Sequence, residues 1–282
     1  MDNSSATITG TLYVVATPIG NLDDISLRAI NTLKTVDSIL AEDTRHSAQL
    51  LHALAIQKPL LALHDHNEAS KSTDIISALK QGKSFALISD AGTPLISDPG
   101  FILVRLAQQE GIRVVPIPGA CALITALCAS GVPCDSFVFA GFLPAKQQAR
   151  LSKLHSFRQS EHSVIIYEST HRIMACLEDL ITVYGNDYRF VLAKELTKTF
   201  EHILHASGQD IIAWLQGESG RAKGEFVLIL PALPPEDMQG EDEKMLGVLL
   251  AELPLKQAVK LASLLSKTPK NDLYKMALKM NE

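Results

Sequence analysis

Short apolar runs alternate with amphipathic helical patterns over the first 118 residues, and this alternation limits the folds open to the chain. The apolar runs have the length and the polar flanks of buried strands, and helical spacing of apolar residues separates them. The expected strands are 12–16, Ser38–Ala41, 60–63, Phe85–Ile88 and 114–117, and the expected helices lie near 26–33, 47–54, 74–80 and 101–110. Such strands pair in parallel through right-handed crossovers, so we predict an α/β domain on a parallel sheet.

Polar loops follow three of these strands, at 17–21, 42–45 and 90–94. Ligands of open α/β sheets bind outside the carboxyl ends of the strands, so the three loops are expected to line one pocket. The third loop opens the stretch SDAGTPLISDPG (89–100), in which Gly92 can adopt a positive φ and Pro94 fixes the backbone. Asp98 is predicted to cap the helix that follows, with Gly111 at its end.

The chemistry of the stretch 89–100 narrows the ligand. It has no Lys or Arg and matches no phosphate-binding glycine motif, whereas Asp90 and Asp98 add negative charge. We expect a cationic or hydroxyl-bearing small molecule rather than a polyphosphate. An ordinary strand-to-helix turn, with Asp, Gly and Pro as its punctuation, is the alternative interpretation of the same residues.

The pattern changes after residue 118, and we predict further domains there. The expected elements are a helix at 120–129, strands at 137–143, 163–167, Arg189–Lys194, 200–205 and 226–230, and helices at 146–157, 171–184 and 211–215. Several of these strands are joined by short turns, so the second sheet is expected to be mixed. We therefore predict two α/β domains, at 1–118 and 119–232, followed by a Pro-rich acidic linker at 233–244.

Three short helical patterns, at 245–252, Leu255–Leu265 and 269–280, form a C-terminal module over 245–282. With its short second turn this module resembles a helix-turn-helix, and a helical cap or a dimer contact is the alternative. The net charge of the chain is −5, which argues against a basic nucleic-acid coat. The module differs, because six Lys against two acids give residues 254–282 a net charge of +4.

The cysteines and the chain start bear on the compartment. The four cysteines form no C-x-x-C pair and no zinc-ligand spacing, so we expect no metal and reduced thiols. Residues 1–5 lack the charged and apolar segments of a signal peptide, and we expect a cytoplasmic protein. The uncharged stretch 114–134 is interrupted by Pro and Gly, which leaves its helical core far too short for a membrane span.

Several longer motifs occur in a fixed order along the chain. They are TLYVVATPIGNLDD (11–24), AEDTR (41–45), SDAGTPLISDPG (89–100), VPIPGACA (115–122), FAGFLP (139–144), YESTHR (167–172), AKELTKTFE (193–201) and GEF (224–226). Together they resemble the tetrapyrrole-methylase superfamily over roughly residues 10–232, and their number and order make the resemblance specific. The resemblance implies a two-domain fold with S-adenosylmethionine in the cleft, and the C-terminal module resembles a helix-turn-helix extension of that superfamily.

Within the superfamily, the motifs are most similar to those of enzymes that 2′-O-methylate the ribose of cytidine 1402 in 16S rRNA of the small (30S) ribosomal subunit. The cofactor contacts that the resemblance implies are Pro18, Asp90, Ala91, Gly92, Thr93, Ile96, Cys121 and Ala122. One position departs from the pattern, because Thr93 stands where many members carry Asp. Asp90 is the candidate to supply that negative charge.

Methyl transfer to a ribose hydroxyl requires alignment of the reacting atoms and a general base. The candidates for catalysis are Lys194 and Glu195, with Lys198 and Glu201 nearby, and Glu168 and Arg172, with His171 between them. Internal ion pairs that orient the domains are the alternative role for the same residues. The candidates for RNA phosphate contacts are Arg45, Arg172, Arg221, Lys256, Lys260, Lys267 and Lys270.

Two other functions compete with rRNA methylation. The first is a C-methyltransferase that acts on a tetrapyrrole such as a precorrin, against which the basic module and the AEDTR and YESTHR motifs argue. The second is a DNA-binding regulator that senses a metabolite, but the module offers mostly Lys for reading base edges. We expect an enzyme that acts on 16S rRNA, has no membrane partner and, by the resemblance, forms a homodimer.

Overall fold

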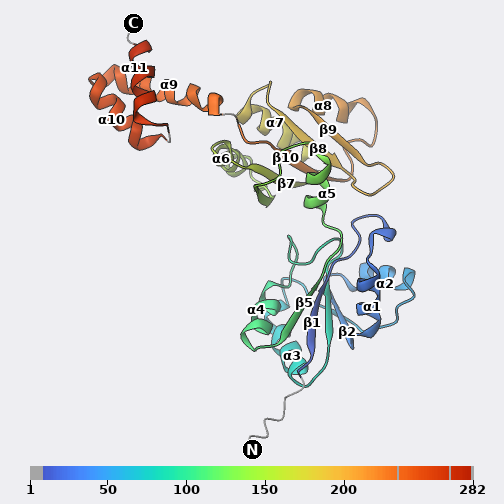
Figure 1. The fold of residues 1–282 in the computed structure, drawn as a ribbon. Coiled ribbons are helices and arrows are strands. Elements are labelled where there is room, and N and C mark those ends of the chain that lie inside the picture. The colour runs from blue at the N-terminus through green and yellow to red at the C-terminus, as the bar shows by residue number, and fades with distance from the viewer. Residues whose placement is uncertain (1–8, 234, 267, 281–282) are drawn as a thin grey trace, which may run out of the picture.

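A computed structural model of the chain describes residues 9–233, 235–266 and 268–280. Two α/β units, each built on a five-stranded sheet, follow one another along the chain, and three helices form the C-terminal module (Figure 1). This is the predicted architecture, whereas the individual domain boundaries stay predictions. Residues 1–5 and Lys267, on which expectations were placed, lie outside the described residues.

The sheet of the first unit is parallel throughout, as predicted, and its strand order is β3–β2–β4–β1–β5. Its strands are β1 (Thr11–Val15), β2 (Ser38–Ala41), β3 (Leu60–Ala62), β4 (Phe85–Ile88) and β5 (Arg113–Ile117). Its helices are the 3₁₀ helix η1 (Leu22–Asp24) and α1 (Leu27–Thr35), α2 (Thr44–Ala53), α3 (Glu68–Lys80) and α4 (Phe101–Gln109). Neighbouring residues of β2 belong to separate hydrophobic clusters on the two faces of the sheet. Ile39 packs with α1 and α2, and Leu40 packs with α3 and α4. Both faces of the sheet are therefore covered.

The start of α4 differs from the prediction. Asp98 does not cap this helix, because Gly100 is the N-cap, with φ +126°, and offers no side chain. The first free N–H groups of α4 donate instead to the buried carboxylate of Glu68, at 2.7 and 3.2 Å. Glu68 lies about thirty residues earlier, on α3, so a tertiary contact has replaced the local cap. Gly111 does follow the helix end, with φ +68°.

The second sheet is mixed, as predicted, with the strand order β6–β7–β10–β8–β9. Its strands are β6 (Phe137–Phe142), β7 (Ser163–Ser169), β8 (Arg189–Lys194), β9 (His202–Ser207) and β10 (Glu225–Leu230). Only β6 and β7 pair in parallel within the described sheet; the other pairs are antiparallel. The helices of this unit are α5 (Ala122–Ala129), α6 (Gln147–Arg158), α7 (Ile173–Tyr184) and α8 (Gly208–Gly217).

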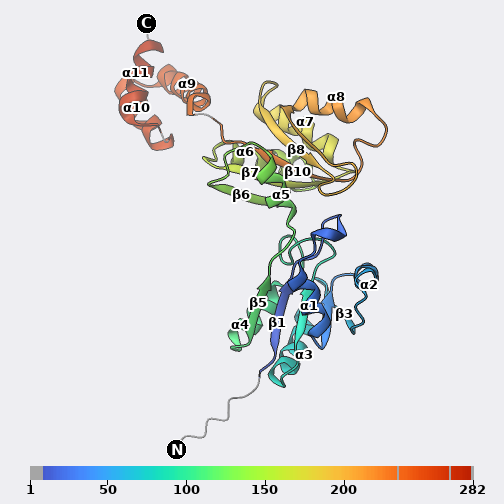
Figure 2. The same ribbon diagram turned by 45° about the vertical axis from the view of Figure 1, so that its right-hand side comes forward.

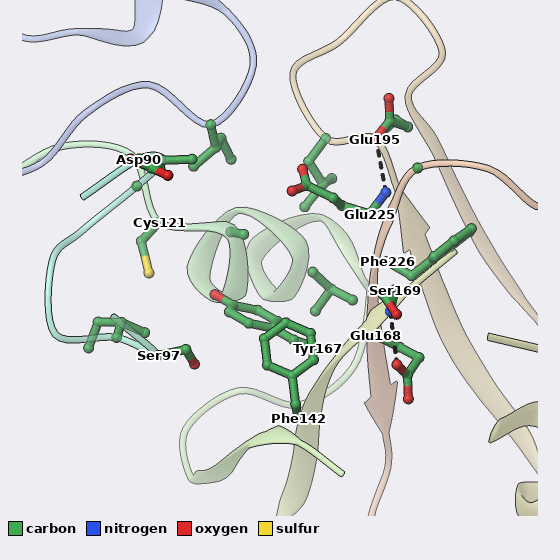
Figure 3. Close-up of a pocket in the computed structure, with 18 of the residues that line it drawn as sticks. Asp90, Ser97, Cys121, Phe142, Tyr167, Glu168, Ser169, Glu195, Glu225 and Phe226 are labelled. Atoms are coloured by element: carbon green, nitrogen blue, oxygen red, sulfur yellow. Dashed lines mark hydrogen bonds between the residues drawn. The ribbon is translucent and has the colours of Figure 1, made fainter. Parts of the chain in front are cut away.

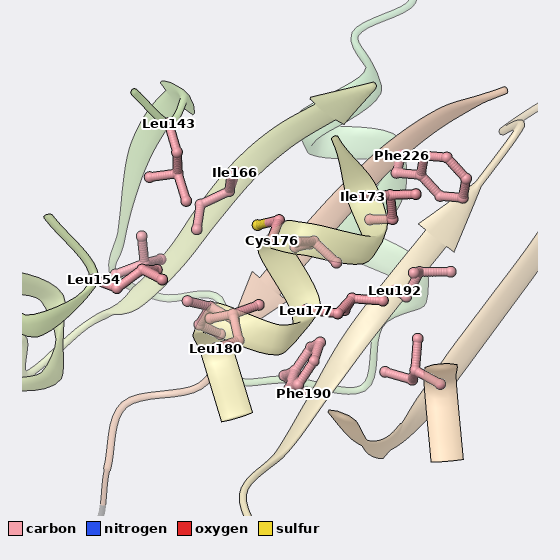
Figure 4. Close-up of a cluster of buried hydrophobic side chains, with 14 of the residues drawn as sticks. Leu143, Leu154, Ile166, Ile173, Cys176, Leu177, Leu180, Phe190, Leu192 and Phe226 are labelled. Carbon is pink, nitrogen blue, oxygen red and sulfur yellow. The ribbon is translucent and has the colours of Figure 1, made fainter. Parts of the chain in front are cut away.

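Each face of the second sheet has its own core. On one face, α6, α7 and α8 cover a cluster that includes Phe190, Phe226 and Cys176 (Figure 4). On the other face, α5 packs against residues such as Val191 and Val227. Side chains of neighbouring strand residues point to opposite faces. Alternate residues of a strand therefore face alternate sides of the sheet. A residue near a strand end either joins the core under α6, α7 and α8 or faces the first unit.

The C-terminal module consists of α9 (Pro235–Glu252), α10 (Leu255–Leu265) and α11 (Lys270–Met280) around a small core of Leu246, Val259 and Leu273. Most of the linker expected at 233–244 is helical, since α9 begins at Pro235. Proline is tolerated there because it occupies the first position of the helix. The module projects from the α6 and α7 side of the second unit, away from the first unit (Figures 1 and 2). Among the described residues, no helix is both long and apolar enough to cross a membrane.

Candidate functional site

A cavity of about 630 Å³ lies between the two α/β units (Figure 3). One wall is the segment 90–98 of the first unit, with Ile19 from the loop after β1. The opposite wall comes from the ends of β7, β8 and β10 and the turns beside them, and Cys121 and Ala122 at the start of α5 complete the lining. The cavity thus lies at the carboxyl edge of the parallel sheet, where an open α/β sheet binds its ligand.

The loop after β4 is fixed to the loop after β1 by a two-way backbone bridge. The Thr17 N–H donates to the Gly92 carbonyl at 2.8 Å, and the Gly92 N–H donates to the Thr17 carbonyl at 3.1 Å. Gly92 has φ +85°, and a Cβ at this position would lie 3.2 Å from Cγ2 of Ile19. A side chain at residue 92 would therefore meet both backbone strain and a crowded wall.

Backbone strain is concentrated around the cavity. Of the five non-glycine residues with positive φ in the described chain, four flank it: Leu95, Ser97, Glu195 and Thr197. Their φ values are 71°, 75°, 49° and 66°. Such conformations persist where surrounding structure enforces them, and they gather at ligand sites.

Tyr167 forms the apolar part of the lining. Its hydroxyl accepts a hydrogen bond from the Leu123 N–H at 3.0 Å, and its ring meets Phe139 and Phe142 edge-on, with centroids 4.9 and 5.8 Å apart. Burial, assisted by the neighbouring Cys121, raises the pKa of Tyr167, so the phenol stays neutral. The ring is therefore held as a rigid, uncharged surface in the cavity.

Lys198 and two carboxylates carry the charge on the wall of the second unit. Its Nζ lies 3.0 Å from Oε1 of Glu195 and 2.7 Å from Oε2 of Glu225. Partial burial acts to raise the pKa of Glu195, but the Glu225 N–H and Lys198 outweigh it and lower that pKa. Partial burial likewise acts to lower the pKa of Lys198, and the two carboxylates reverse the shift. Glu195 and Lys198 are therefore both charged at neutral pH.

The wall of the first unit is acidic. Asp98 lines the cavity, and burial together with the charges of Glu42 and Asp90 raises its pKa to about 7. Burial and the Asp90 charge also raise the pKa of Glu42, which directly follows the strand β2. Asp90 accepts a hydrogen bond from the Asp43 N–H at 3.2 Å. No group of His, Cys, Asp and Glu in the described part of the chain could hold a metal ion.

Comparison with known proteins identifies the family. The model of Tetrapyrrole (Corrin/Porphyrin) Methylases matches residues 11–212, and the model of the RsmI C-terminal HTH domain matches residues 236–281. The chain belongs to the tetrapyrrole methylase family. Ribosomal RNA small subunit methyltransferase I of Haemophilus influenzae is 52% identical to it over 275 residues, which are 96% of this chain and 97% of the relative. The protein of that name from Escherichia coli O157:H7 is 49% identical, over 98% of this chain and 96% of the relative.

Solved structures of tetrapyrrole methylase fold agree with this assignment. Uroporphyrin-III-C-methyltransferase from Thermus thermophilus has a TM-score of 0.55 at 18% identity, and the match covers 78% of this chain and 94% of that chain. A diphthine synthase has a TM-score of 0.60 at 14% identity, covering 79% and 90%. At these identities the likeness shows the fold alone.

The cofactor contacts that the tetrapyrrole methylase resemblance implied come together in the structure. Seven of the eight line the cavity: Asp90, Ala91, Gly92, Thr93, Ile96, Cys121 and Ala122. Thr93 also joins the segment to the domain junction, because its hydroxyl donates to the Ala120 carbonyl at 3.0 Å. Pro18 is not among the lining residues, although Ile19 beside it is. The loop 42–45 does not line the cavity either, since α2 already begins at Thr44.

The four catalytic candidates separate into two sets. Glu195, paired with Lys198, and Glu168 line the cavity, whereas Lys194 and Arg172 do not. Glu168 and Lys194 are the register partners of Phe226 on either side, so all three side chains share the helix-covered face. Lys194 is accordingly only 4% exposed. This face lies opposite the one that carries Tyr167 and Val227.

Glu168 and Arg172 form a buried pair on that helix-covered face. Oε1 of Glu168 accepts from the Ser169 N–H at 2.9 Å and lies 3.3 Å from Nε of Arg172. The Arg172 guanidinium also donates to the Leu143 carbonyl at 2.5 Å. The pair therefore ties the turn after β7, which lines the cavity, to the end of β6.

The RNA-binding candidates lie apart from one another. Arg45 is 90% exposed in its side chain and pairs with Asp43 at 2.7 Å. Arg221 stacks over Trp214, 4.7 Å from the ring centroid. The described lysines among the candidates, Lys256, Lys260 and Lys270, are all exposed on the module.

Sequence reasoning missed two features of the cavity. The sequence indicates the negative charge of Asp98 but assigns its carboxylate to a helix cap, and it gives no sign that Ser97 lines the cavity. Tyr167 and Phe142 lie within quoted motifs, but nothing in the sequence indicated that their rings face the cavity. The parity of β7 would have placed Tyr167 there once its pairing with β10 was known.

Proposed function

We propose that this protein transfers a methyl group from S-adenosylmethionine to the 2′-hydroxyl of the ribose of cytidine 1402 in 16S rRNA. The observation that carries the proposal is the cavity between the two units, whose lining brings together Asp90, Ala91, Gly92, Thr93, Ile96, Cys121 and Ala122. It occurs in a chain whose near-full-length relatives are named ribosomal RNA small subunit methyltransferase I. The match extends through the C-terminal module.

S-adenosylmethionine suits the cavity in size and charge. Pockets of about 300–1,000 Å³ hold drug-sized ligands, and this cavity lies within that range. Asp90 adds negative charge to the lining, which favours a ligand with a sulfonium and an ammonium group, and Tyr167 offers an apolar face. We propose that the Gly92 backbone approaches the ligand closely, and that Pro18 sets the course of the adjoining loop.

S-adenosylmethionine supplies the electrophilic methyl group, so the chain has chiefly to align the hydroxyl oxygen with it and to remove a proton. The strained segments that carry Ser97 and Glu195 hold opposite walls in a fixed geometry suited to this task. Of the catalytic candidates, Glu195 fits a role inside the cavity. Glu168, Arg172 and Lys194 fit the other role considered for them, which is to orient the wall of the second unit.

We propose further that the substrate is the 30S subunit or its 16S rRNA, met in the cytoplasm, and that the exposed lysines of the module contact phosphates. The chain is also proposed to form a homodimer. Exposed apolar side chains on the edge strand β6, namely Phe137, Val138 and Phe142, support a contact of this kind. Light scattering of the purified protein measures the oligomeric state.

The proposed function is tested by offering the purified protein methyl-labelled S-adenosylmethionine with 30S subunits, with naked 16S rRNA, or with a precorrin. Label in a 2′-O-methylcytidine of the RNA, identified by nucleoside mass spectrometry, is the expected result. The same modified nucleoside should be absent from the small-subunit RNA of cells lacking this protein. Label transfer to the precorrin alone would instead identify a tetrapyrrole C-methyltransferase.

A further inference from the structure

Asp98 is a cavity carboxylate that is not engaged in holding the fold together. The N–H groups at the start of α4 donate to the Glu68 carboxylate, and Asp98 does not cap that helix. Leu95 and Ser97, just before it, have φ values of 71° and 75°, and Gly100 just after it has φ +126°. Asp98 thus lines the cavity from within a strained segment, of the kind that gathers at ligand sites.

The other carboxylates that line the cavity have partners, and Asp90 accepts a hydrogen bond from the Asp43 N–H at 3.2 Å. Glu195 and Glu225 share the ammonium group of Lys198. Glu168 pairs with Arg172 on the helix-covered face of the sheet. Among the described residues, no cation forms an ion pair with Asp98.

The groups that face Asp98 are acidic or neutral. Glu42, just after β2, and Asp90, just after β4, face it from the first unit, and the Ser89 side chain opposes their effect by lowering its pKa. Tyr167 faces it from β7 of the second unit. Beyond Glu42 lie Asp43, Asp65 and His64. Burial and the two carboxylates raise the pKa of Asp98 to about 7, which suits a group that takes up a proton near neutral pH.

Resting on the proposed function, we propose that Asp98 is the general base that accepts the proton of the ribose 2′-hydroxyl. The O–H bond breaks with its proton passing to a carboxylate oxygen of Asp98, while the hydroxyl oxygen forms the new bond to the methyl carbon. The carbon–sulfur bond breaks, and its electron pair stays on sulfur. The sulfonium charge is thereby lost, Asp98 ends protonated, and it returns the proton to water without any further reactant.

Asp98→Asn tests the proposal, because the amide keeps the shape of the side chain but accepts no proton at neutral pH. We expect kcat on 30S subunits to fall by about 10²–10⁴-fold. The Kd of S-adenosylmethionine, measured by calorimetry, should stay within about twofold, since base catalysis contributes to turnover rather than to binding. In the ligand-free wild type, a carboxyl ¹³C resonance should titrate near pH 7, and it should be missing from Asp98→Asn.

Glu42→Gln is the second variant, since Glu42 faces Asp98 but does not line the cavity. Removing its charge should move the Asp98 resonance and the acidic limb of the kcat–pH profile to lower pH together, with cofactor affinity unchanged. If Asp98 had only a structural role, its resonance and the acidic limb of the kcat–pH profile would not shift together. Three results overturn the proposal. In Asp98→Asn, they are a loss in kcat of less than about tenfold, or a loss of cofactor affinity instead of a loss in kcat. In Glu42→Gln, it is an acidic limb of the kcat–pH profile that does not move.

The failure of this proposal differs from the failure of the proposed function. If the wild type labels 16S rRNA and Asp98→Asn does so equally well, only the role of Asp98 is wrong. If the wild type itself transfers no label to the RNA, both proposals are wrong.

Discussion

The aliphatic chain of Lys198 lies directly against Gly20, so close that a Cβ at Gly20 would stand 2.4 Å from Cγ of Lys198. Gly20 follows β1 of the first unit, whereas Lys198 follows β8 of the second, so this contact joins the two units beside the cavity. The Nζ of Lys198 is also anchored by Glu195 and Glu225. The absence of a side chain at Gly20 thus allows Lys198 of the second unit to pack against the backbone of the first unit.

Gly20→Ala is expected to weaken S-adenosylmethionine binding by about tenfold, which is about 1.4 kcal/mol. The new Cβ displaces Lys198, whose bonds to Glu195 and Glu225 are then lost. Calorimetry measures the affinity, and circular dichroism checks the fold. In a Lys198→Ala background the same change should weaken binding much less, because the clashing side chain is gone; additive losses would contradict the predicted contact.

Gly92→Val is expected to abolish cofactor binding while the fold survives. The valine side chain must adopt φ near +85° and enters the space beside Ile19. Gly111→Val is the matched control, because Gly111 also has a positive φ, +68°, but has nothing within 4 Å of its Cβ position. Both variants should lose stability, and only Gly92→Val should lose binding in calorimetry. Undiminished binding in Gly92→Val would show that the ligand lies elsewhere.

Asp179→Ala is expected to destabilise the second unit by about 3–5 kcal/mol, since it leaves Arg150 charged and unpaired in the interior. The two side chains are 3% and 5% exposed, and Nε of Arg150 lies 2.6 Å from Oδ2 of Asp179. Glu110→Ala breaks a pair with Lys80 that is about half exposed, and about 0–1 kcal/mol is expected. Urea denaturation compares the two variants, and equal shifts of the midpoint would refute the difference.

Local patterns sufficed for much of the fold because burial follows the apolar runs directly. Ser38–Ala41 and Phe85–Ile88 are strands with the predicted bounds, since each is an apolar run that enters the cores on both faces of the sheet. The site residues 90–96 followed from a motif whose Gly and Pro restrict the backbone. These features depend on neighbours in sequence.

What the sequence did not predict depends on partners that are distant in the chain. The role of Asp98 changed because Glu68, on another helix, serves the N–H groups of α4. The sequence also could not place Glu168 and Lys194, because the pairing register of β7, β10 and β8 puts them on the same face as Phe226. Neither register nor a tertiary cap is encoded in local spacing.

The stability of the ligand-free protein should depend on pH through Asp98. Its pKa is about 7 in the folded state against 3.8 for an ordinary aspartate, so the folded state holds the proton more tightly than the unfolded state does. The stabilisation is full below about pH 4 and is lost as the pH rises through 7. Asp98→Asn should therefore gain stability relative to the wild type between pH 4 and pH 7. A difference in urea midpoint that stays constant across this window would contradict the shifted pKa.

The last prediction concerns the lysines of the C-terminal module. Lys256 and Lys260 lie four residues apart on α10, and Lys270 begins α11; all three are exposed. No ion pair involves any of them among the described residues, whereas Lys275 on α11 lies 3.4 Å from Asp272. The module projects away from the first unit, so its lysines are free to meet an extended RNA surface beyond the cavity (Figure 2).

Replacing Lys256, Lys260 and Lys270 with Gln in the full chain should weaken the binding of 30S subunits. The log–log slope of affinity against salt should fall by roughly one unit for each lysine that contacts a phosphate. The affinity for S-adenosylmethionine should not change, because the cavity belongs to the two α/β units. The control is the double variant Lys34→Gln and Lys83→Gln, which changes two exposed lysines of the first unit. It should leave the log–log slope of affinity against salt unchanged. An unchanged slope in the module variant would mean that the three helices only cap the fold, because counterion release must accompany any phosphate contact that those lysines make.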